Sequence, residues 1–357
     1  MRIKITLLLI ILCSLLSAQQ KTNRSLVFYP YIMFSTESNL MFGGYVMHTS
    51  RPQDIEMNIP PNSISINSIY TLKKQCVIRL QPEFQIKKGK YSIAFPITYK
   101  NWPSSFYGIG NSTDENAEEE YTSQFIEMQL SAKRRFLHKL EFEIFYEIDN
   151  YKILKLENCG ILSAEEIPGS RNCLISGLGF SLIYNTRDNS FLPSSGNYCK
   201  LENTFFNDLF GSDLNFSQYK LDIRKFLPVR EGNTVAFQGL FTYTKNEAPF
   251  QKLADLGSKM RGYNGGRFID DHRLILRSEY RLFPWKSGKQ SRIGFAGFVE
   301  CGQVAPSIKE IQFAELKCSG GIGLRFILIP DEKFTLRIDY AIGKNSTDLI
   351  LISQEAF

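Results

Sequence analysis

Regular alternation of apolar and charged residues constrains the fold of this chain more than any other feature. In the segment 140–149, the apolar residues Leu140, Phe142, Ile144, Tyr146 and Ile148 alternate with acidic residues, with Phe145 as the one exception. Successive side chains of a strand point to opposite faces, so such a segment has one apolar and one charged face. The segments 274–282 and 334–342 follow the same pattern. The pattern predicts strands that separate an apolar environment from a polar one.

The alternating segments are long and recur to the end of the chain, with no helical segment between them. We predict roughly sixteen strands, an even number, as bacterial barrels require. They lie near 25–35, 39–49, 62–71, 75–85, 90–100, 121–135, 138–152, 175–186, 197–207, 215–227, 233–244, 272–283, 292–302, 317–328, 334–343 and 347–357. A soluble β-sandwich also alternates, but a length of about ten residues suits a tilted membrane crossing. Closing the sheet also removes the edges that lipid does not tolerate. We therefore expect an all-β fold, a transmembrane antiparallel β-barrel of about 16 strands.

The N-terminus has the composition of an export signal. Met1–Lys4 carries two basic residues, Ile5–Leu16 is apolar, and Ser17–Ala18 supplies small residues. This order is typical of a secretory signal peptide, and the apolar run is too short to span a bilayer as a helix. An N-terminal membrane anchor is the alternative. We expect residues 1–18 to be a signal peptide and 19–357 to be a barrel domain in a bacterial outer membrane.

The composition argues against several classes of protein. Charged residues make up 22%, aromatic residues 13%, and the mean hydropathy is −0.18, as expected for strands that average apolar and polar faces. The net charge of +6 is modest and spread along the chain, so no nucleic-acid partner is expected. His48, His138 and His272 do not cluster with cysteines or carboxylates, so we expect no metal and no cofactor. No nucleophile motif accompanies these histidines, which argues against an enzyme.

The seven cysteines offer two candidate disulfides. Cys13 would leave with the signal peptide. Cys159 and Cys173 lie near the two ends of one predicted external loop, and export to an oxidising compartment permits a disulfide between them. Two free buried thiols are the alternative. Cys301 and Cys318 flank another external loop and form the second candidate pair.

The connections between strands alternate between compact turns and long loops. Arg187–Gly196 and Trp285–Ser291 are compact and rich in turn-forming residues. Asn111–Glu120, Glu157–Asn172 and Lys245–Asp271 are longer and mostly polar. Bacterial barrels have short periplasmic turns and long external loops, so both ends of the chain are expected in the periplasm. The acidic run of the first long loop is most simply solvated, because no ligand spacing supports a calcium site.

Four pieces of the sequence resemble the barrel of the BamA/TamA family, the bacterial surface antigen superfamily. The first is Gly177–Asn189 followed by Pro193 and Gly196, which the turn residues alone identify as a hairpin. The second is Arg261–Tyr263 (Arg-Gly-Tyr), preceded by Met260, in the longest loop. The family carries a Val-Arg-Gly-Phe/Tyr motif at this place in the strand order. The resemblance implies that this loop folds back into the lumen and brings Arg261, Gly262 and Tyr263 with it.

The third piece is Phe298–Gly302, which resembles the Phe-x-Asp-x-Gly of the family, with Glu300 in place of Asp. In the family that acid pairs with the loop arginine, so the resemblance implies that Arg261 pairs with Glu300. The alternation places Glu300 and Gly302 on the lumen face, where small residues leave room for a loop. Glu279 faces the lumen by the same count and matches the family's acidic position on that strand.

The fourth piece is the C-terminus, Leu349–Phe357. A final strand ending in Phe357 resembles the signal by which the barrel assembly machinery recognises its substrates. A chain that merely ends in an aromatic residue is the alternative. The resemblance is best from Ser176 to Phe357, and the first half of the chain fits by strand pattern only. Family members that insert or secrete proteins carry POTRA domains before the barrel, whereas the first predicted strand of this chain starts near Ser25. We therefore expect a barrel-only member without POTRA domains.

The resemblance implies a role in outer-membrane protein assembly, insertion or translocation. The alternative is a passive pore or structural barrel, in which the loop plugs and stiffens the wall. Buried charges must be paired, so Arg261 with its two acids is then wholly architectural. The expected partners are outer-membrane lipid, the barrel assembly machinery during the chain's own insertion, and client or partner outer-membrane proteins. Conductance in planar bilayers favours a pore, and faster folding of a client barrel favours assembly.

Overall fold

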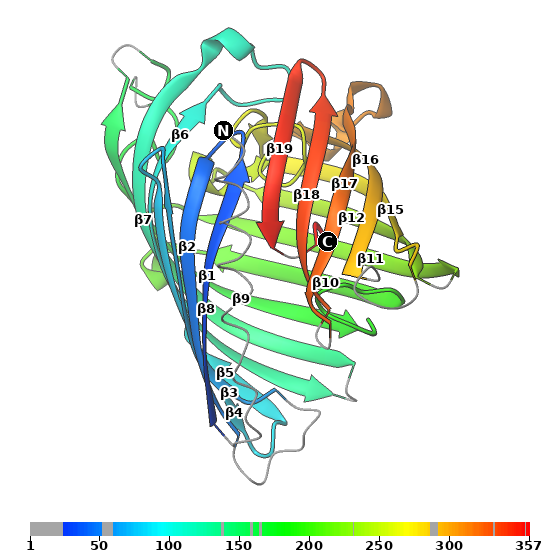
Figure 1. The fold of residues 1–357 in the computed structure, drawn as a ribbon. Helices are drawn as coiled ribbons and strands as arrows, with labels where there is room; N and C mark the ends of the chain where they lie inside the picture. The colour runs from blue at the N-terminus through cyan, green and yellow to red at the C-terminus, as the bar shows by residue number, and fades with distance from the viewer. Residues whose placement is uncertain are drawn as a thin grey trace.

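The computed structural model describes residues 24–51, 60–136, 139–157, 160–163, 166–230, 232–285, 292–330, 333–353 and 355–357 (Figure 1). The barrel strands are β1 (Arg24–Ser35), β2 (Asn39–Ser50), β3 (Asn62–Thr71), β4 (Cys76–Ile86), β5 (Tyr91–Ala94), β6 (Ile97–Phe106), β7 (Glu119–Phe136), β8 (Leu140–Leu156), β9 (Cys173–Asn185), β10 (Gly196–Phe206), β11 (Phe216–Arg230), β12 (Asn233–Lys245), β15 (His272–Leu282), β16 (Ile293–Ala305), β17 (Lys317–Ile329), β18 (Phe334–Gly343) and β19 (Ser346–Ser353). The loops carry β13 (Ala254–Asp255), β14 (Ile269–Asp270) and the short 3-10 turns η1 (Glu115–Ala117), η2 (Asp208–Phe210), η3 (Phe250–Lys252), η5 (Ile308–Glu310) and η6 (Phe313–Glu315).

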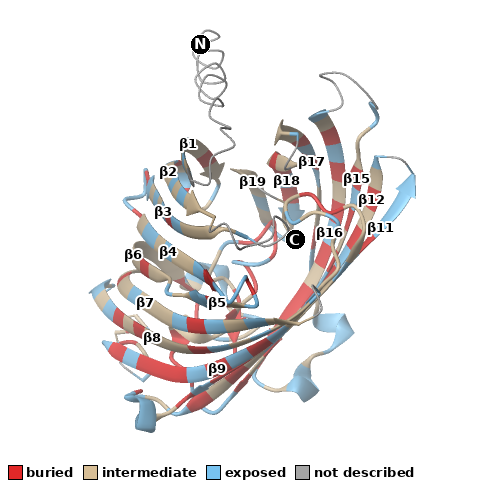
Figure 2. Ribbon diagram, turned by 90° about the horizontal axis from the view of Figure 1, so that it is seen from below, coloured by how far each residue is buried: buried red, intermediate tan, exposed pale blue. Residues whose placement is uncertain are grey.

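These strands form a closed antiparallel barrel of 16 strands, which confirms the predicted fold class. Each strand pairs with its neighbour in the chain, and the ring is visible end-on in Figure 2. β5 and β6 are two halves of one crossing, because both lie between β4 and β7. The predicted strand 90–100 is therefore interrupted, at Phe95 and Pro96. A proline cannot donate a ladder hydrogen bond, which accounts for the break at this point.

The alternation seen in the sequence sorts side chains between the two faces of the wall. Phe142 and Ile144 of β8 are exposed on the outside, whereas Asp149 is buried inside. On β15, Arg277 and Glu279 are buried and Leu276 is exposed. The barrel therefore presents an apolar exterior and a charged interior, as the fold of an outer-membrane barrel requires. No helix among the described residues is long and apolar enough to cross a membrane.

The strands differ in length around the ring. β7 and β8 have 18 and 17 residues, and they form the tallest part of the wall. β18 and β19 have 10 and 8 residues. The last strand is shorter than predicted, because the expected segment 347–357 leaves the sheet after Ser353. The barrel is consequently lowest where the two ends of the sheet meet.

Loops fill one end of the barrel and extend into its interior. The loop between β12 and β15, residues 246–271, is the longest and is called the lumen loop below. Its residues Leu256, Met260 and Phe268 are buried against Ile275 and Val304 of the wall. Other loops contact it: Gly110 N–H donates to Ile269 O at 2.8 Å, and Gln251 Nε2 donates to Gly169 O at 2.7 Å. The lumen loop and the loops that contact it thus form one packed layer inside the barrel.

Candidate functional site

The lumen loop approaches the inner wall closely enough to require glycine at three positions, one in the loop and two in the wall. Gly262 has a φ of 85°, in the left-handed region, and a Cβ there would lie 3.1 Å from Gly343 N. A Cβ on Gly343 would in turn lie 2.6 Å from Gly262 O. A Cβ on Gly302 would lie 2.7 Å from Leu256 Cδ1. These missing side chains let the backbone of the loop rest directly against β18 and let the side chain of Leu256 rest against β16.

Arg261 lies at the centre of a buried charge network. Its Nε donates to Glu300 Oε1 at 2.7 Å, and its Nη1 donates to Glu279 Oε2 and Asp339 Oδ2, each at 2.8 Å. The guanidinium carbon also lies 3.4 Å from the centre of the Phe298 ring. Arg261 is 5% exposed, and its three carboxylate partners are fully buried. The loop arginine is therefore attached to β15, β16 and β18 at once.

Burial and charge act in opposite directions on the pKa of Arg261. Burial lowers it, but Glu279, Glu300 and Asp339 raise it more, and the resulting pKa is above the ordinary value. The group stays charged at every accessible pH. Its charge is compensated by fixed carboxylates rather than by water, so removal of either side leaves an uncompensated buried charge.

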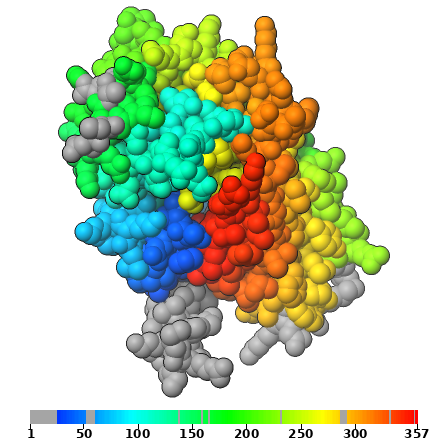
Figure 3. All heavy atoms as spheres, turned by 90° about the horizontal axis from the view of Figure 1, so that it is seen from above, coloured from blue at the N-terminus to red at the C-terminus, as the bar shows by residue number. Residues whose placement is uncertain are grey.

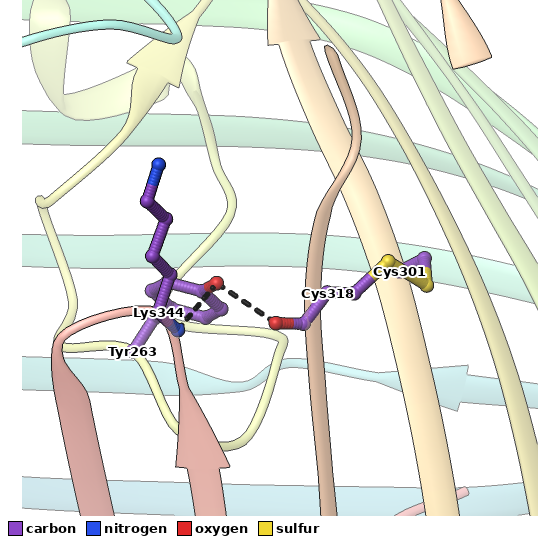
Figure 4. Close-up of a disulfide and its surroundings, with 4 residues drawn as sticks. All are labelled: Tyr263, Cys301, Cys318 and Lys344. Carbon is purple, nitrogen blue, oxygen red and sulfur yellow. Dashed lines mark hydrogen bonds between the residues drawn. A yellow bond between two sulfur atoms is a disulfide. The ribbon is translucent and has the colours of Figure 1, made fainter. Parts of the chain in front are cut away.

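Tyr263, the third residue of the predicted loop motif, also contacts the wall. Its hydroxyl donates to Cys318 O at 2.9 Å and accepts from Lys344 N–H at 3.2 Å (Figure 4). The ring is 5% exposed and packs against Phe268. The structure therefore brings together all of the predicted lumen residues: Arg261, Gly262, Tyr263, Glu279, Glu300 and Gly302.

The network contains further residues that were not predicted. Arg325 Nη1 donates to Asp339 Oδ1 at 2.6 Å, and Arg281 Nε donates to Glu279 Oε1 at 2.8 Å. Arg337 Nη1 also donates a hydrogen bond to Asp339 Oδ2. The alternation does place Asp339 and Arg337 on the polar face of their segment. It gives no information on which strand lies beside the loop, so it did not identify Asp339 as a third acceptor.

The C-terminal residues correct the prediction of a strand that continues to Phe357. Phe357 is 4% exposed and packs against Phe226 and Ala236 on the inner wall. Arg325 Nε donates to Glu355 Oε2 at 2.8 Å. Buried arginines and an apolar patch of the wall bind the end of the chain inside the lumen, and Figure 2 shows the C-terminus within the ring of strands. Whether Phe357 serves as an assembly signal remains a proposal.

Among the described residues, a disulfide links Cys301 to Cys318, the second of the two candidate pairs. The two residues are register partners on β16 and β17 (Figure 4). The predicted disulfide between Cys159 and Cys173 is wrong, because Cys173 has a free thiol. Cys173 starts β9 with its side chain buried against Tyr151 and other apolar residues of the lumen. Cys159 lies outside the described residues.

The seam between the first and last strands is the least paired junction of the barrel. β1 pairs with β2 over its whole length but with β19 at a single residue pair, Phe34 with Leu351. Leu349 N–H donates to Thr36 Oγ1 at 3.0 Å just beyond that pair. In the same register the last residue of β19, Ser353, faces Ile32. The earlier part of β1 therefore has no strand beside this edge among the described residues, although the two ends of the sheet lie next to each other in Figure 3.

A family model described as the Omp85 superfamily domain matches residues 81–351. The chain belongs to the Omp85 superfamily. The match begins in β4 and ends in β19, so it includes the lumen loop and every strand that Arg261 contacts. A search of curated protein sequences finds no match.

Solved structures of Omp85 barrels resemble this one in fold. BamA from Haemophilus ducreyi lacking POTRA domains 1–3 superimposes with a TM-score of 0.66 at 14% identity, over 94% of this chain and 70% of that one. CdiB from Acinetobacter baumannii gives 0.61 at 12% identity, over 93% and 60% of the two chains. CdiB from Escherichia coli gives 0.60 at 7% identity, over 94% and 64%. At these identities the likeness is one of fold, and the chain spans about two thirds of the length of these relatives.

Proposed function

We propose that this Omp85 barrel lies in the bacterial outer membrane and assists the insertion or translocation of other proteins. The observation that carries the proposal is the seam: β1 has a partner strand on one side only along most of its length. The mechanism we propose is that this edge pairs with an incoming strand. The partners of such a barrel would be outer-membrane lipid and unfolded client proteins.

The physical basis is the energy of an unpaired strand edge. Main-chain N–H and C=O groups without partners are costly in lipid, where no water replaces the missing hydrogen bonds. An extended segment that adds to an exposed edge satisfies these groups through main-chain bonds, independent of its sequence. Pro30 lies in the middle of β1, and a proline is tolerated where a strand edge lacks a hydrogen-bonding partner. The edge of β1 is therefore suited to a transient partner strand.

The lumen loop supports this proposal because it is bonded to the wall on both sides of the seam. Arg261 ties the loop to β15, β16 and β18, and Gly265 N–H donates to Glu37 Oε2 at 3.0 Å in the turn between β1 and β2. Burial raises the pKa of Glu37. The loop thus contacts the wall on both sides of the seam. A rigid wall on both sides would confine movement to the seam itself.

A passive pore is less well supported by the same interior. The lumen loop and the C-terminal residues occupy the space inside the ring. The cavity between the loop and the seam strands, lined by Lys259, Arg277, Arg337 and Ile350 among others, has a volume of about 330 Å³. That volume accommodates a few side chains rather than a wide channel.

The test is to lock the seam and measure the folding of a client. A Phe34→Cys/Leu351→Cys variant joins the one register pair of the seam, and a Val46→Cys/Ile66→Cys variant joins β2 to β3 in the same way as a control. Folding of an eight-stranded barrel into liposomes should be accelerated by the control in its oxidised state. The locked seam should lose that acceleration and regain it on reduction. A large steady conductance with no acceleration from any variant would instead support the passive pore.

A further inference from the structure

The C-terminal residues 355–357 occupy a built site on the inner wall. Phe357 packs against Phe226 of β11 and Ala236 of β12, and all three are at most 4% exposed. Arg281 Nη2 donates to the main-chain oxygen of Phe357 at 3.1 Å. The Arg281 guanidinium also lies 5.6 Å from the centre of the Phe357 ring. The aromatic ring and its main chain are therefore both bound by the wall.

Glu355 makes the second half of the contact. Arg325 Nε donates to its Oε2 at 2.8 Å, and Arg281 Nε lies 3.7 Å from the same oxygen. Glu355 is 2% exposed at its side chain. A carboxylate removed from water to this extent requires such cationic partners. The site thus recognises an acid and an aromatic residue two positions apart.

The binding groups of the wall are held in place by contacts of their own. Arg281 donates to Glu279 at 2.8 Å, and Arg325 donates to Asp339 at 2.6 Å. Both arginines are at most 1% exposed, and their orientation does not depend on the tail alone. The four wall residues Phe226, Ala236, Arg281 and Arg325 are called the tail site. Their preorganisation means that little ordering is needed when a ligand binds.

We propose that the tail site is a peptide-binding site for segments that carry a glutamate two residues before a phenylalanine, and that residues 355–357 are its resident ligand. The resident segment has no strand partner, since β19 ends at Ser353. Ala356 of this segment lines the 330 Å³ cavity together with Ser35 and Ile350 of the seam strands. A peptide near the seam can therefore reach the site when the tail leaves it.

This inference goes beyond the proposed function and does not depend on it. The tail site lies on β11, β12, β15 and β17, not on the edge of β1. It discriminates by side chains, whereas strand addition to β1 depends on main-chain bonds. A binding assay without a client barrel therefore tests the site alone, and failure of the insertion assay leaves its result unchanged.

The experiment removes the resident ligand and supplies it as a free peptide. A chain ending after Ser353 is refolded in detergent, and its heat-dependent gel mobility verifies that the barrel is closed. A fluorescent peptide Ile-Ser-Gln-Glu-Ala-Phe, blocked at both ends, is titrated by anisotropy. We expect saturable binding to the shortened chain and none to the full chain at the same concentration. Peptides with Glu→Gln or Phe→Ala should bind roughly tenfold more weakly or worse.

Variants of the wall complete the test. Arg281→Lys in the shortened chain should weaken peptide binding, because the planar fork that binds both Glu355 and the Phe357 main chain is lost. Arg224→Lys is the matched control, since Arg224 faces the lumen but bonds Asp222 instead. If the shortened chain fails to fold, the full-length Glu355→Gln/Phe357→Ala variant vacates the site without shortening the chain. Equal binding of all three peptides, equal binding by the full and tail-free chains, or no binding by a folded tail-free chain would overturn the proposal.

Discussion

Glu300 binds both the main chain and the side chain of Arg261. One carboxylate oxygen accepts from the Arg261 N–H at 2.7 Å, and the other accepts from its Nε at 2.7 Å. A single residue of β16 thus fixes the backbone of the lumen loop and the direction of its guanidinium together. Loss of Glu300 is therefore expected to release the loop, even though two other carboxylates still contact Arg261.

Replacement of either partner should destabilise the barrel. Arg261→Ala leaves three buried carboxylates without their shared cation, and Glu300→Ala leaves two N–H donors unpaired. Each change is expected to cost on the order of 3 kcal/mol, and the double variant should cost less than the sum. Unfolding in urea, followed by the heat-dependent gel shift, measures these differences. Lys73→Ala at an exposed turn is the control and should change little. Additive effects of the two single changes would contradict the direct coupling.

Gly262→Ala should displace the loop from β18. The φ of 85° is unfavourable for alanine, and the new Cβ would lie 3.2 Å from the Cβ of Ser319. We expect a loss of about 1–3 kcal/mol in the free energy of unfolding. Gly297→Ala is the matched control, because a Cβ there meets no atom within 4 Å. Similar unfolding midpoints for the two variants would show that the loop does not need this close approach.

Oxidation should link Cys301 to Cys318 and leave Cys173 as a thiol. Mass spectrometry of peptides from the unreduced protein is expected to contain the 301–318 link, and Cys173 should be alkylated only after unfolding, because it is buried. The linked residues are 17 positions apart, so reduction should lower stability by roughly 3 kcal/mol on chain-entropy grounds. A 159–173 link in the same digest would show that Cys173 is oxidised and would reverse this assignment.

The β13–β14 pairing in the lumen loop should weaken as the pH rises. Burial raises the pKa of Asp270 to about 6, above the unfolded value of about 4. The folded state therefore holds the proton more tightly, and the resulting stability is present below pH ~4 and lost as the pH passes ~6. At pH 7.5, amide exchange across Ala254–Asp255 should be slower in Asp270→Asn than in the unaltered protein, and the difference should shrink at low pH. Asp208→Asn in another loop is the control, and a pH-independent difference would exclude this cause.

The sequence predicted the wall well because a wall strand is defined by local alternation. The predicted strand 272–283 is observed as β15, His272–Leu282, and the pattern also placed Glu279 and Glu300 on the lumen face. Two strands were predicted with the wrong bounds, one because of a proline and the other because of contacts with residues distant in sequence. Pro96 interrupts a segment that is otherwise alternating, and the last segment leaves the sheet because Arg281 and Arg325, distant in sequence, bind its end.

The candidate site was predictable only where a motif marked it. Arg261 and Glu300 lie in segments that resemble family motifs, so the pairing followed from the resemblance. Asp339 carries no such mark, and its role depends on β18 lying next to the loop. The unpaired edge of β1 depends on the register of Phe34 with Leu351. Alternation within a strand does not specify how the first and last strands of a chain pair with each other.

The uneven height of the wall has a consequence for the surrounding bilayer. A strand of 8 residues such as β19 spans about 27 Å even when upright, and less when tilted, whereas the 18 residues of β7 span about 60 Å. In the outer membrane that we propose for this barrel, lipid beside the short strands would thin to match their apolar height, and lipid beside β7 would not. Hydrophobic mismatch would then be concentrated at the place where the first and last strands meet. Acyl chains there would pack less regularly than around the rest of the circumference, and the barrier to entry of a segment from the membrane plane would be lower.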